Sequence, residues 1–99
     1  MKPVRLREAA KGDLREALRW YGERDPDLAN RLFAELRVTF EFLEQFPKAG
    51  RRVPEVTDRD VRRLPVHTFP YHVVYLELRS RISVLAIAHD KRAPEYWRG

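Results

Sequence analysis

The sequence predicts an α+β fold with the order β-α-α-β-β-β, in which a helical hairpin packs on one face of a mainly antiparallel four-stranded sheet. Three observations predict it. Apolar and charged residues alternate in residues 3–8, apolar residues recur at helical spacing from residue 9 to 46, and three strand-like runs follow residue 60. Because 99 residues make one domain of ordinary size, we expect a single domain over residues 1–99.

The first half of the chain is expected to hold one strand and two helices. Val4 and Leu6 alternate with arginines, which indicates a short half-buried strand over residues 3–8. A helix over residues 9–24 follows, with one apolar face formed by Leu14, Ala17, Leu18 and Tyr21. Asp25-Pro26 begins a second helix, because Asp caps free N–H groups and Pro fits the first helical position. That helix ends at Pro47, and its predicted apolar face consists of Ala29, Leu32, Phe33, Leu36, Phe40 and Leu43.

The second half of the chain is expected to form a β-meander. Residues 48–60 show no periodicity and carry many charges, which favours a surface loop. Strands are predicted over residues 61–67, 69–78 and 81–88. The last run, RISVLAIA, is almost entirely apolar, as is typical of a strand that is covered on both faces or central in a sheet. We expect the N-terminal strand to pair with it, and one face of the sheet to remain without helices.

Composition excludes several classes of protein. The absence of cysteine excludes disulfides and thiolate metal sites. No apolar run is long enough for a membrane span or a signal peptide, so we expect a cytoplasmic protein that does not associate with membranes. The net charge is +5, and residues 51–99 hold ten basic and six acidic side chains. An anionic partner is therefore expected to bind the second half of the chain.

Few enzyme signatures fit this sequence. The four glycines form no phosphate-binding loop, and His67, His72 and His89 are not at helical metal-ligand spacing, so we expect no metal and no cofactor. What remains is a set of arginines next to aromatic rings in the second half, a combination that suits RNA contact or phosphate chemistry without a metal.

An RNA-cleaving site would need an acid, a base and cations that stabilise the phosphorane charge. If the chain is a ribonuclease, we expect His89 or Tyr96 to transfer protons, and Arg63 and Arg92 to bind the phosphate. The alternative for each of these residues is a solvated surface position or a tail that covers the core.

Four sequence segments together resemble one family. They are Ala10-x-x-Asp13-Leu14, then Phe46-Pro47 with Gly50, then VRRLPV-x-x-FPYHVVYLEL, and finally ISVLAIAHDKRAPEYW. In this order they resemble the RelE/ParE superfamily of toxins from type II toxin–antitoxin modules. The ending from His89 to Trp97 is most similar to the ParE-like or plasmid-stabilisation members. The superfamily fold has the same β-α-α-β-β-β order.

The resemblance implies a toxin that inhibits DNA gyrase and forms a hetero-oligomer with a cognate antitoxin, whose acidic C-terminal segment wraps over it. The implied alternative is a RelE-like mRNA interferase, a metal-independent endoribonuclease that acts on mRNA in the ribosome. A third reading is a family member with little toxicity that binds its antitoxin and represses the operon. The residues expected to bind the antitoxin or the target are Phe42, Phe46, Arg51, Arg52, Arg62, Tyr71, Tyr75 and Trp97.

Overall fold

A computed structural model of the protein describes residues 1–91. Its elements are β1 (Val4–Leu6), α1 (Glu8–Arg24), α2 (Pro26–Gln45), β2 (Arg51–Arg52), β3 (Val61–Pro65), β4 (Tyr71–Glu77) and β5 (Ile82–His89). The strands form one five-stranded sheet in the order β1-β5-β4-β3-β2. β1 is parallel to β5, and the other pairs are antiparallel.

The predicted fold class and the predicted pairing of the N-terminal strand with the last strand are confirmed. The number of strands differs from the prediction. Two residues of the predicted loop, Arg51 and Arg52, form the additional edge strand β2 by pairing with Arg63 and Arg62 of β3.

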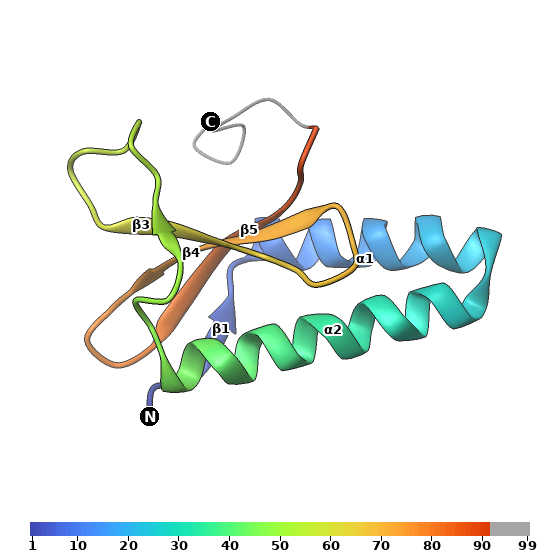
Figure 1. The fold of residues 1–99 in the computed structure, drawn as a ribbon, viewed down its shortest axis with the longest axis horizontal. Coiled ribbons are helices and arrows are strands. Elements are labelled where there is room, and N and C mark those ends of the chain that lie inside the picture. Colours follow the sequence, from blue (N-terminus) through green and yellow to red (C-terminus); the bar gives the residue numbers. More distant parts are fainter. Residues whose placement is uncertain (92–99) are drawn as a thin grey trace.

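The two helices lie side by side on one face of the sheet, and the turn that joins them projects beyond the sheet (Figure 1). Asp25 caps α2 as expected, since its side chain accepts a 3.0 Å hydrogen bond from the backbone N–H of Asp27. Between the helices and the sheet lies a core that includes Leu32, Leu36 and Leu43 of α2.

The buried face of α2 is rotated slightly from the predicted one. Thr39 is buried, and its hydroxyl donates to the backbone oxygen of Glu35 at 2.9 Å. Because this bond satisfies the hydroxyl within the helix, the residue can be buried without a further partner. Phe33, which the apolar pattern placed on the core face, is instead 47% exposed.

The other face of the sheet has its own apolar cluster. Val53 and Val56, from the segment between β2 and β3, pack there with Val61, Val74 and Leu85 of the sheet. The sheet face that was predicted to carry no helices is therefore partly covered by a segment without regular structure.

A β-bulge in β5 determines which of its side chains face the helices. Val74 lies opposite Ala86, but Tyr75 lies opposite Val84, so Leu85 is an extra residue on β5. As a result Val84 and Ile87, three positions apart, both face the helices, while Leu85 faces the other side. All residues from Ile82 to Ala88 are buried, which confirms the expectation of a strand covered on both faces.

Tyr75 joins the sheet to the segment that follows α2. Its fully buried hydroxyl donates to the carbonyl of Pro47 and accepts from the N–H of Gly50, both at 2.8 Å. Burial raises the pKa of Tyr75, and the hydrogen bond from Gly50 opposes that rise. Gly50 has to lack a side chain, because a Cβ there would lie 2.7 Å from the tyrosine oxygen and 2.8 Å from the carbonyl oxygen of Arg63.

A pair of lysines holds the end of β4. Glu77 accepts from Lys2, which precedes β1, at 2.8 Å, and from Lys48, which follows α2, at 3.4 Å. The bond from Lys2 is the main reason why the pKa of Glu77 lies below its ordinary value, and Lys48 contributes further.

Replacing Tyr75 with Phe is expected to lower the free energy of unfolding by about 1–3 kcal/mol, because the buried N–H of Gly50 loses its partner. Urea denaturation measures this. Tyr71→Phe is the control. Within the described residues the half-buried Tyr71 makes ring contacts, and its hydroxyl has no hydrogen bond like those of Tyr75. Equal losses in both variants would contradict a specific role for the Tyr75 hydroxyl.

The ion pairs of Glu77 are expected to make stability depend on pH. Because folding lowers this pKa, the contribution is present above the ordinary value of 4.5 and is lost as the pH falls through the lowered pKa. The groups are partly exposed, so Glu77→Gln should reduce the free energy of unfolding at pH 7 by only about 0.2–1 kcal/mol. At pH 3 the difference from wild type should shrink, whereas exposed Glu55→Gln should have little effect at either pH. A difference that persists unchanged in acid would show that the ion pairs are not its source.

Candidate functional site

Arg51 and Arg63 meet on the sheet face opposite the helices. They are direct cross-strand partners on β2 and β3, and both are exposed. Arg63 also lies opposite Val74, whose side chain belongs to the cluster on that face. With Pro65, His72 and Asp90 they line a hollow of about 350 Å³, called the arginine hollow below. In it the Nδ1 of His72 lies 2.9 Å from an Asp90 carboxylate oxygen.

Arg52 and Arg62, one register position away, have acidic partners. The Nε atoms of Arg52 and Arg62 lie 3.1 and 3.2 Å from the same Asp60 oxygen. Arg62 also donates to the carbonyl oxygens of Lys48 and Gly50, at 3.1 and 2.9 Å. Its side chain is only 18% exposed. Its donors therefore hold the segment after α2 in place, and binding of a partner by Arg62 stays a prediction.

The prediction for Tyr75 was wrong. The residue was expected on a binding surface, but none of its surface is exposed and its hydroxyl has two partners within the fold. An aromatic residue in a strand-like run is equally compatible with either sheet face, so the sequence did not reveal this burial.

His89 and Tyr71 come together on the opposite face of the sheet, the face toward the helices. They are cross-strand partners with ring centroids 5.1 Å apart in an edge-to-face arrangement. The N–H of Lys91 donates to His89 Nδ1 at 3.1 Å, which places the proton of a neutral imidazole on Nε2. Burial raises the pKa of Tyr71, and the neighbouring Tyr21 and the carboxylates of Glu16 and Asp13 raise it further.

The hollow beside His89 is aromatic and acidic. It has a volume of about 170 Å³ and is lined by Asp13, Glu16, Ala17, Trp20, Tyr21, Tyr71, Ile87 and His89. Asp13 also has a structural role, since its carboxylate accepts from the N–H of Ile87 at 3.0 Å, beyond the point where β1 stops pairing with β5. Sequence reasoning assigned no role to Asp13. The sequence did contain a signal for this role. Asp13 lies four residues before the buried Ala17 and therefore on the apolar face of α1, where a carboxylate needs a partner.

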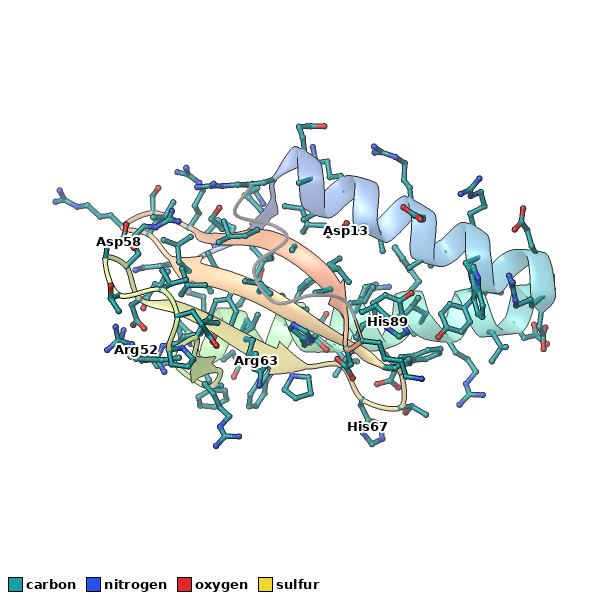
Figure 2. All side chains as sticks on the ribbon, turned by 90° about the horizontal axis from the view of Figure 1, so that it is seen from above. Asp13, Arg52, Asp58, Arg63, His67 and His89 are labelled. Atoms are coloured by element: carbon teal, nitrogen blue, oxygen red, sulfur yellow. The ribbon has the colours of Figure 1, made fainter. Side chains whose placement is uncertain are left out.

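Arg63 and His89, two residues of the expected ribonuclease set, are not brought together. Arg63 lies opposite Val74 on the face without helices, whereas His89 lies opposite Tyr71, which packs against the helix side. β4 separates their strands, and Figure 2 labels both positions. Arg92, Tyr96 and Trp97 lie outside the described residues.

Phe42 and Phe46 are exposed at the C-terminal end of α2. Their exposed fractions are 46% and 54%, and their ring centroids are 5.0 Å apart. They line an open, mainly apolar hollow of about 520 Å³ with Gln45, Pro47, Lys48, Ala49 and Glu77. We call this the phenylalanine hollow.

Residues 1–91 contain neither a group of metal ligands nor a membrane-spanning helix. No three side chains of the types that ligate metals are grouped closely enough there to hold an ion. Neither of the described helices has the length and apolarity needed to cross a membrane.

Comparison with known proteins identifies the family. The sequence model for the ParE toxin of the type II toxin–antitoxin system, parDE, matches residues 4–94. A solved structure described as the chromosomal ParDE TA system from P. aeruginosa shares the fold, with a TM-score of 0.74 and 20% sequence identity over 90% of this chain and 96% of that one. A search of curated proteins found no match. Because the family match extends over almost the whole described chain, this protein belongs to the ParE toxin family of type II toxin–antitoxin systems.

Proposed function

We propose that this protein inhibits DNA gyrase in the cytoplasm and is neutralised by a cognate antitoxin. The observation that carries the proposal is the match of the ParE toxin family to residues 4–94. Gyrase inhibition is the activity that the resemblance implies for ParE-like members.

The arrangement of the described residues supports gyrase inhibition over mRNA cleavage. A phosphodiester-cleaving site needs its cations and its proton-transfer group around one phosphate. Arg63 and His89 lie on opposite faces of the sheet, and carboxylates of Asp13 and Glu16 line the hollow beside His89. Negative charges at that position would repel a phosphate.

We also propose that the antitoxin binds at the phenylalanine hollow. Exposed aromatic pairs are typical anchors of protein interfaces. Lys48 on the rim is already paired with Glu77 and Asp60, at 3.4 and 3.7 Å, so in this proposal the two aromatic rings provide the anchor. In this proposal the complex is a hetero-oligomer.

The gyrase proposal is tested with the purified toxin in a supercoiling and DNA-cleavage assay, run beside an assay of mRNA cleavage on ribosomes. We expect gyrase to be inhibited and the inhibition to disappear when the antitoxin is mixed in first. Cleavage of mRNA at codon positions with unaffected gyrase would contradict the proposal. No response in either assay, with no harm on induction in cells, would favour the reading of a binding partner with little toxicity.

For the antitoxin site, Phe42→Ala and Phe46→Ala are each expected to weaken antitoxin binding by about tenfold or more, since each removes a central aromatic contact. Isothermal titration calorimetry measures the loss. Phe33→Ala is the matched control, because Phe33 is 47% exposed and lies two and a half helical turns from Phe42, on the opposite side of α2. An equal loss in the Phe33 variant would contradict the proposed location.

A further inference from the structure

The arginine hollow holds two positive charges that the described chain does not neutralise. Arg51 and Arg63 are direct partners across antiparallel strands, where like charges destabilise the pairing. Within residues 1–91, neither guanidinium has an ion pair or a hydrogen bond, since the only carboxylate in the hollow, Asp90, lies against His72.

The adjacent register position shows the opposite arrangement. There Arg52 and Arg62 are also direct partners, but Asp60 lies between them and contacts both. Among the described residues, the same two strands therefore contain one arginine pair with an acidic partner and one pair without it. The latter pair lies on an exposed hollow of about 350 Å³, which is accessible to a ligand.

A phosphate group has the chemistry that this pair requires. Its oxygens accept hydrogen bonds from two guanidinium groups at once, and arginine presents planar paired donors suited to such contacts. The hollow is larger than a single anion needs, and Pro65 and the His72 ring on its wall can contact an attached sugar. The edge position of β2 leaves the hollow open to an extended polyanion.

We propose that the arginine hollow binds a backbone phosphate of duplex DNA, with Arg51 and Arg63 on the same phosphate. The choice of duplex DNA as the source of the phosphate rests on the proposed function, because gyrase acts on duplex DNA. The contact would place the toxin against the DNA that gyrase holds.

The test measures binding of a fluorescein-labelled DNA duplex to the full toxin by anisotropy, without gyrase, over a series of salt concentrations. Arg51→Gln/Arg63→Gln is compared with Arg15→Gln/Arg19→Gln, which removes the same charge from exposed positions on α1. We expect the first variant to reduce the magnitude of the negative slope of log association constant against log salt concentration by about 1–2. The second variant should change this slope little. Thermal unfolding checks that both variants fold, and the first should be no less stable than wild type because it removes a like-charge contact.

Two results would overturn the proposal. One is an equal loss of DNA binding in both variants, which would mean that only net charge matters. The other is an absence of DNA binding combined with binding of an acidic peptide that depends on Arg51 and Arg63, which would make the ligand a protein. Because the assay contains no gyrase, a failure of gyrase inhibition alone would leave the DNA site standing and would count against the proposed function only.

Discussion

The contact between the Tyr75 hydroxyl and the backbone of Pro47 and Gly50 is the interaction on which the rest of the structure depends. It fixes the point where the chain leaves α2 and enters the sheet, and it requires that Gly50 lack a side chain. The next residue is Arg51, so the position of β2 and of the arginine hollow follows from this contact. Arg62 reinforces it by donating to the carbonyls of Lys48 and Gly50.

The arginines of β2 and β3 form two pairs that differ in their acidic neighbours. Asp60 contacts Arg52 and Arg62, and these two side chains help to hold the edge of the sheet. Arg51 and Arg63 lack such a partner within the described chain, and both side chains are exposed there. The excess of positive charge in the second half therefore does not act as one uniform surface.

Periodicity predicted the helices, the principal strands and the pairing of β1 with β5, because those elements follow local apolar spacing. It did not predict β2, whose two arginines carry no apolar alternation and follow directly after the point where Tyr75 holds the backbone of Gly50. The site was less predictable. Whether Arg63 and His89 share a face depends on strand register, and the extra residue at Leu85 shifts the side-chain alternation along β5. Charge drew attention to Arg51 and Arg63, and Phe42 and Phe46 fall outside the predicted apolar face of their helix; all four are exposed. Neither signal distinguishes a surface tyrosine from the buried Tyr75.

The parallel pairing of β1 with β5 has a consequence for folding. β5 lies between β1 and β4, contributes to both apolar clusters and is the last element of the described chain. During synthesis β1 and the helical hairpin emerge first, but the strand on which they pack emerges only after all other elements. Contacts so distant in sequence form slowly because the long loop between them must close first. The two apolar clusters of the described chain are therefore complete only once β5 has joined the sheet.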